Sequence, residues 1–306
     1  MSHPDTLVAP SNGSDGHPMD ASIDARRNLA ANFRHVSVQG EGDSGPDRLA
    51  PPARVLARWL DEYHAAYVEA NEAENGGSLH LLQARTLTLA GDHLLGATED
   101  VVTMARAALR GGMSTTLAVS VAAMAAQPHA VAALREAVPL QYRIDCTGLG
   151  LQPSPQALAA CRGTLAAHVE AGGNISLIGD VATIRATGLL ADELFNRNFV
   201  TITPRPHADM RRMNRPHALA PCRDYIAWFV DAAGDVFPCA GMLGHAPARF
   251  GSIHEPFSHL IDALAYSAVS IDSLSRRGPR IADDQARFPA DLCALHRLSV
   301  HGIATL

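Results

Sequence analysis

The chain has 306 residues, 47% of them hydrophobic, and a formal net charge of −6 at pH 7. A chain of this size can bury one large core, or a core with a small appendage. The acidic balance gives no reason to expect nucleic acid as a partner, since a phosphate-binding face needs clustered basic residues. All 25 basic residues are arginine, which excludes Schiff-base, pyridoxal-phosphate and phosphate-loop lysines.

Residues 1–32 are polar, contain glycine and serine, and show no periodicity, so we expect a disordered leader. They lack the basic-then-apolar layout of a signal peptide, and no stretch of about eighteen consecutive apolar residues occurs in the chain. We therefore expect a cytoplasmic protein with no membrane partner. Five cysteines, an odd number, suit a reducing compartment with a metal site better than a disulfide framework.

Predicted strands alternate with amphipathic helices from Phe33 to Thr203. The strands are expected at Phe33–Gln39, Thr86–Ala90, Thr115–Val119, Tyr142–Cys146, Asn174–Ile178 and Phe199–Thr203. The helices are expected from Ala53 to about Ala70, and at Thr98–Arg110, Ala122–Ala137, Pro155–Ala171 and Val181–Leu194. This alternation is typical of a parallel α/β sheet, either open and doubly wound or closed toward a barrel.

A β-hairpin is predicted after these units. Tyr225–Val230 is rich in β-branched and aromatic residues, and Asp231–Asp235 is turn material in which Gly234 can adopt positive φ. Such a hairpin brings Cys222 and Cys239 close together. The thiols then either pack as buried cysteines or form half of a metal site.

The other half of that site is predicted in the Cys-x-x-His unit of Cys293 and His296. Three thiolates and an imidazole satisfy either tetrahedral zinc or one [4Fe-4S] cluster. The sequence therefore predicts one metal centre that holds the C-terminal region in place, with its metal left open.

The spacing Cys222, eleven residues, Gly234, four residues, Cys239 resembles the start of the SPASM or twitch domain of radical S-adenosylmethionine enzymes. Phe250–Ile253 resembles the glycine turn that often follows it. The resemblance implies an α/β fold: a partial (β/α)6 TIM-like barrel over residues 33–204, then a small SPASM/twitch-like metal-binding region over residues 205–306. It also implies an auxiliary iron-sulfur cluster. The further cysteine-rich run of SPASM domains is absent, so at most one such site is expected.

A second point of resemblance lies at the end of the second predicted strand. Radical S-adenosylmethionine enzymes carry Gly-Gly-Glu-Pro there and use it to hold the amino group of S-adenosylmethionine. This chain has Ala90, Gly91, Asp92 and His93, so Gly91 and Asp92 are the predicted cofactor-binding residues. The alternative is a strand-to-helix turn in which Asp92 caps the helix.

The chain departs from the family in the loop after the first strand, where the family places Cys-x-x-x-Cys-x-x-Cys. Gly40–Arg54 contains no cysteine, and Cys146 and Cys161 do not have the spacing to replace the motif. We expect Cys146 to pack beneath its turn. The resemblance thus implies a degenerate member without radical chemistry.

Two functions stay open for such a protein. The first is a binding or accessory subunit in peptide or small-molecule biosynthesis, whose partner is an active enzyme, a peptide or a small molecule. The second is an enzyme that uses the barrel mouth for other chemistry, or a protein that binds S-adenosylmethionine without cleaving it.

Overall fold

One nine-stranded sheet organises the part of the chain that the computed structural model describes: residues 35–39, 52–75, 85–146, 155–186, 188–190, 200–203, 227–237, 243 and 249–266. The strands are β1 (His35–Gln39), β2 (Arg85–Ala90), β3 (Met113–Ser120), β4 (Gln141–Asp145), β5 (Ile175–Ile178), β6 (Val200–Thr203), β7 (Ala227–Val230), β8 (Asp235–Phe237) and β9 (Gly251–Ser252). The helices are α2 (Ala53–Asn75), the 3-10 helix η2 (Asp92–Gly96), α3 (Thr98–Arg110), α4 (Val121–Ala126), α5 (Pro128–Ala137), α6 (Pro155–Glu170), α7 (Val181–Ala186) and α10 (Phe257–Tyr266).

The strand order is β6-β5-β4-β3-β2-β1-β7-β8-β9. Strands β1 to β6 are parallel, and each lies beside the next one in the chain. The predicted α/β class with a mainly parallel sheet is therefore confirmed. The hairpin of β7 and β8 continues the same sheet, because β7 pairs in parallel with the free side of β1. The leader and the boundary at residues 204 and 205 lie outside the described residues.

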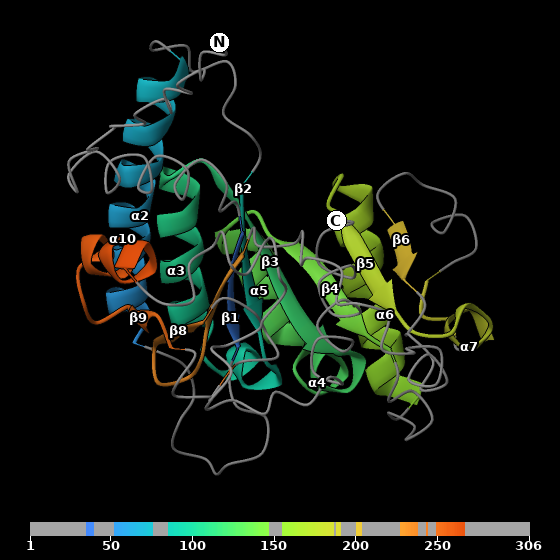
Figure 1. Cartoon of the computed structure of the whole chain (residues 1–306). Coiled ribbons are helices and arrows are strands. Elements are labelled where there is room, and N and C mark those ends of the chain that lie inside the picture. The colour runs from blue at the N-terminus through green and yellow to red at the C-terminus, as the bar shows by residue number, and fades with distance from the viewer. Residues whose placement is uncertain are drawn as a thin grey trace, which may run out of the picture.

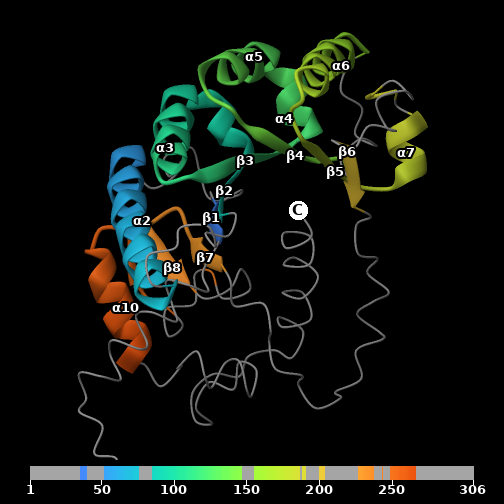
Figure 2. The same ribbon diagram turned by 90° about the horizontal axis from the view of Figure 1, so that it is seen from above.

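The described helices that connect β1 to β6 lie on one face of the sheet (Figure 2). Sequential neighbours joined by right-handed crossovers require this arrangement. The sheet bends into an arc, with α2, α3, α5 and α6 on its outer side (Figures 1 and 2). The hydrophobic core fills the layer between the strands and these helices, with residues such as Leu87, Leu117 and Ile144 fully buried.

We call the opposite side of the arc the concave face. Strand side chains alternate between the two faces, so this face carries the residues that lie between the core positions. It is rich in small polar side chains. Its described members in β1 to β6 are His35, Ser37, Gln39, Thr86, Thr88, Ala90, Ser114, Thr116, Ala118, Ser120, Gln141, Arg143, Asp145, Ser176, Ile178 and Thr201.

Two predicted helices are corrected. The single helix expected over Ala122–Ala137 is two helices that meet at Gln127, because Pro128 cannot donate a backbone hydrogen bond within a helix and instead occupies a first-turn position. The helix expected over Val181–Leu194 ends at Ala186. Gly188 has φ +58 and its N–H bonds to the Arg185 carbonyl at 2.9 Å, a left-handed glycine termination.

Helix α10 was not predicted from the sequence. Phe257 packs edge-to-face on Trp59 and Tyr63 of α2, with ring centroids 5.3 and 5.5 Å apart. The Glu62 carboxylate accepts a hydrogen bond from the Phe257 backbone N–H at 2.8 Å, which satisfies a donor at the start of α10. The helix is therefore anchored to α2 by both apolar and polar contacts.

Arg85, the first residue of β2, is buried on the helix side with 4% of its surface exposed. Its guanidinium lies 3.9 Å from the Tyr67 ring centroid and 5.5 Å from that of Tyr63. It donates to the Gly111 carbonyl at the end of α3 and to Nδ1 of His64 at 2.8 Å. Cation–π contacts and a helix C-terminus stabilise the buried positive charge, although Nη1 has no hydrogen-bond partner among the described residues.

The contact with Arg85 requires a neutral His64 ring whose Nδ1 accepts. Burial first, and then the charge of Arg85, lower the pKa of His64 from 6.5, while Asp61 opposes them. Burial also lowers the pKa of His168. A folded-state pKa below the unfolded value means that the unfolded chain binds more protons, so stability is present above pH 6.5 and is lost as the pH falls through the lowered pKa.

We therefore expect the free energy of unfolding to fall as the pH drops below about 6.5. Urea unfolding between about pH 5 and 8 measures this slope in the wild type and in His64→Gln. Glutamine does not titrate, and its amide oxygen can still accept from Arg85. The free energy of unfolding of the variant should therefore depend less steeply on pH, and His168 accounts for the dependence that remains. His129→Gln, at an exposed position of α5, should keep the wild-type slope. Equal slopes in the wild type and His64→Gln would contradict this account.

Candidate functional site

The carboxyl ends of β1 to β6 meet at one edge of the sheet, because these strands are parallel. Ligands of α/β proteins bind at this edge. Asp92 follows β2, Ser120 ends β3, Asp145 ends β4 and Asp180 follows β5. The chain therefore brings polar side chains from several strand ends to the edge where the scaffold favours binding.

Asp92 connects two of these strand ends. Its Oδ1 accepts from the Ser120 N–H and its Oδ2 from the Ser120 hydroxyl, both at 2.6 Å. The Ser120 Oγ in turn accepts from the Ala123 N–H at 3.1 Å and caps α4. A carboxylate offers about four acceptor positions, and the bonds from Ser120 occupy two of them. Asp92 does not cap η2, which has no side-chain cap.

Gly91 has φ +143, and a Cβ at this position would lie 2.4 Å from the His93 ring. Only glycine fits this backbone and this close approach. The turn therefore explains Gly91 through local packing alone. The roles predicted for Gly91 and Asp92 toward a cofactor stay predictions.

Cys146 packs beneath the edge, as expected. It is 2% exposed, its Sγ donates to the Ile144 carbonyl at 3.7 Å, and a Cβ on Gly179 would lie 3.3 Å from its own Cβ. Burial raises the pKa of Cys146 to about 12 and that of Cys161 to about 11. Since the thiolate is the nucleophile and the metal ligand, neither thiol is poised for chemistry.

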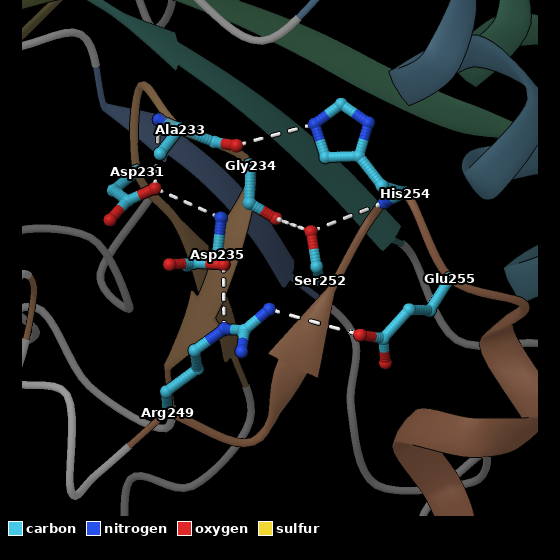
Figure 3. A network of polar contacts seen from close by, with 8 residues as sticks. All are labelled: Asp231, Ala233, Gly234, Asp235, Arg249, Ser252, His254 and Glu255. Carbon is cyan, nitrogen blue, oxygen red and sulfur yellow. Dashed lines mark hydrogen bonds and ion pairs between the residues drawn. The ribbon is translucent and has the colours of Figure 1, made fainter.

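The predicted hairpin turn is present, and Figure 3 shows its contacts. Oδ1 of Asp231 accepts from the backbone N–H groups of Ala233 and Asp235, both at 2.9 Å, and Gly234 has φ +84 as predicted. The Arg249 guanidinium binds Asp235 at 2.6 Å and thereby ties the approach to β9 onto β8. The turn is thus fixed by local polar contacts.

The hairpin turn is tied to β9 by further bonds. The Ser252 hydroxyl donates to the Gly234 carbonyl at 3.0 Å, and the His254 ring lies 3.3 Å from the Ala233 carbonyl oxygen (Figure 3). The second contact places His254 at the hairpin tip. Because β7 runs parallel to β1, with Val38 paired to Val230, this tip lies at the carboxyl edge of the parallel strands, beside the end of β1.

The predicted metal ligands Cys222, Cys239, Cys293 and His296 lie outside the described residues. Among the residues that the structure describes, no three His, Cys, Asp or Glu side chains are grouped to hold a metal ion. In the same part of the chain, no helix combines the length and the apolar character needed to cross a membrane.

Sequence reasoning missed two concave-face residues, Arg143 of β4 and Ser176 of β5. Arg143 is half-buried, and burial lowers the pKa of its guanidinium while Asp145 raises it. Ser176 is 4% exposed, and its Oγ has no hydrogen-bond partner among the described residues. The sequence signal for Arg143 was the alternation in Gln141–Asp145. Tyr142 and Ile144 are apolar and face the core, so Arg143 between them faces the opposite side of the sheet.

Comparison with known proteins gives little guidance. No protein-family model matches the chain, and no curated protein matches it. Among solved structures, the chain is similar to the selenomethionine form of BtrN in an open conformation, with 12% identity over 80% of this chain and 87% of that one, at a TM-score of 0.35. A TM-score of this size does not establish a shared fold.

The buried thiols yield a chemical prediction. We expect Cys146 and Cys161 to resist iodoacetamide in the folded protein at about pH 8 and to react fully once urea exposes them, because their raised pKa values keep them protonated. Peptide mass spectrometry resolves each cysteine separately, and the urea-treated sample is the matched control. Alkylation of either thiol at comparable rates in the folded and unfolded states would show that burial does not protect it.

Proposed function

We propose that the protein is a radical S-adenosylmethionine-like protein without radical chemistry, which acts as a binding or accessory subunit in peptide or small-molecule biosynthesis. The scaffold would be a partial (β/α)6 barrel followed by a SPASM/twitch-like region. Six sequential parallel strands with helices on one face support the first part. The hairpin with its positive-φ Gly234 supports the second.

The observation that carries the proposal is the loop after β1. Gly40–Arg54 contains no cysteine, whereas enzymes of the resembled family place three cluster-binding thiolates there. The described cysteines offer no substitute, since Cys146 and Cys161 are buried with raised pKa values. Without those ligands the loop after β1 would hold no cluster to deliver an electron to S-adenosylmethionine.

A second candidate function is favoured by Asp92. Its exposed carboxylate has acceptor positions that its bonds to Ser120 do not use, and an ammonium group could donate to them. The protein would then bind S-adenosylmethionine without cleaving it, or carry out other chemistry at the same edge. The Ser120 bonds also give Asp92 a purely structural role, which makes this function the weaker of the two.

The C-terminal metal site belongs to the proposal as well. Cys222, Cys239, Cys293 and His296 would hold zinc or one [4Fe-4S] cluster. The rigid turn at Asp231 supports this assignment, because β8 ends at Phe237, only two residues before Cys239. The bound group would act as a structural staple.

The first test is chemical. Incubated with S-adenosylmethionine and dithionite, the full-length protein should form no 5′-deoxyadenosine above a no-protein control, because its loop supplies no cluster ligand. Liquid chromatography with mass detection measures the product, and an authentic radical S-adenosylmethionine enzyme shows that the assay works. Product above the no-protein control would refute the proposed function.

The second test concerns the C-terminal metal site. The native protein, purified without oxygen, should carry zinc or iron, and Cys239→Ser should lose it and become sensitive to protease after Arg205. Structural zinc contributes on the order of 10 kcal/mol of apparent binding energy coupled to folding, so the effect should be large. Cys161→Ala, which removes a thiol from the core, should keep the metal. A native protein with neither metal, or a variant that retains metal and protection, would rule the site out.

A further inference from the structure

The two arginines of the described strands are in opposite situations. Arg85 faces the helices and has its charge compensated by Tyr67, His64 and the Gly111 carbonyl. Arg143 faces the concave side, because its neighbours Tyr142 and Ile144 belong to the hydrophobic core. Its guanidinium makes no hydrogen bond or ion pair within 4 Å to any described residue. A half-buried fork of donors in the sheet thus has no acceptor among the residues that the structure describes.

The strand register defines the surroundings of Arg143. It pairs with Ala118 of β3 on one side and with Ser176 of β5 on the other, and Ser176 pairs with Thr201 of β6. These neighbours have short side chains, and none of them carries a negative charge. The guanidinium is therefore flanked by small groups that can accommodate a ligand and, at Ser176 and Thr201, donate to it.

Ser176 supplies an independent observation. It is 4% exposed and lies on the concave face between the core residues Ile175 and Leu177. Its Oγ finds no hydrogen-bond partner among the described residues. Buried hydroxyl groups are nearly always paired in native proteins, and an exception points to a missing ligand, ion or water. This hydroxyl is the register neighbour of Arg143, whose guanidinium has no hydrogen-bond acceptor among the described residues.

Asp145 is the charged group that could oppose an anion here. It shares the concave face but lies two residues nearer the carboxyl edge than Arg143, opposite Ser120 and Ile178. It is exposed, so water and salt screen its charge. Arg143 and Ser176 lie deeper, where a hydrogen-bonded ion pair is screened less.

We propose that Arg143 and Ser176 form a subsite for an oxyanion, a carboxylate or phosphate group, on a small molecule bound to the concave face. The guanidinium matches either anion with two parallel N–H donors, and the Ser176 hydroxyl donates a third hydrogen bond. This inference rests on the proposed function, since it names the chemistry of the ligand that the binding protein would take.

The test is a titration of the full-length protein with inorganic phosphate and, separately, with succinate, at an ionic strength held constant with sodium chloride. Isothermal titration calorimetry should show saturable binding of at least one anion, and the preferred one identifies the group. Arg143→Gln should weaken binding about tenfold or more, the size of a lost charge-assisted hydrogen bond. Arg106→Gln, at an exposed position of α3, is the matched control and should leave binding unchanged.

Two further variants keep the test decisive if Arg143→Gln fails to fold by circular dichroism. Arg143→Lys retains the charge but loses the paired donors, so it should bind more weakly than the wild type. Ser176→Ala should weaken binding without lowering stability in the absence of anion, because it removes a hydroxyl that has no described partner. Lack of saturable binding of either anion, or wild-type affinity in the folded variants, would overturn the subsite. Formation of 5′-deoxyadenosine would refute the proposed function and leave these titrations unaffected.

Discussion

The handedness of the crossover between adjacent parallel strands determines the character of both faces of the sheet. Because β1 to β6 follow one another in space, right-handed connections place the described connecting helices on the same side. Each strand must therefore be apolar toward that side only. In β4 the result is direct: Tyr142 and Ile144 enter the core, while Arg143 and Asp145 face away from it. A sheet covered by helices on both faces would leave no place for such a row of polar residues.

Much of the fold could be predicted from local sequence. Helix α3 has the predicted bounds, Thr98 to Arg110, because an apolar period of 3.6 residues ends at two glycines. The position of the hairpin could not be predicted, since nothing in Ala227–Val230 encodes β1 as its partner. Helix α10 was also missed. Its anchor, Phe257, is recognisable only once Trp59 and Tyr63 are known to lie beside it.

The candidate site was predictable only where residues adjoin in sequence. The resemblance singled out Asp92 and a strand-end pattern placed Cys146, but Ser120, which binds Asp92, lies 28 residues away and carries no motif. Arg143 and Ser176 carry no motif either. The alternation in β4 assigns Arg143 to the polar face, but a lone arginine and a lone serine are ordinary in any strand. Their interest arises from burial and missing partners, which are properties of the assembled sheet. The four predicted metal ligands stay predictions.

The pairing of β1 with β7 has a consequence for synthesis of the chain. His35 pairs with Ala227, so about 190 residues are made between the first strand and the partner on its second side. At translation rates of about 5 to 20 residues per second, this interval lasts about 10 to 40 s. Until it ends, β1 is an edge strand of the growing sheet, with backbone groups open to pairing with another chain. The duration of that exposure is set by the speed of the ribosome and is independent of how stable the finished sheet becomes.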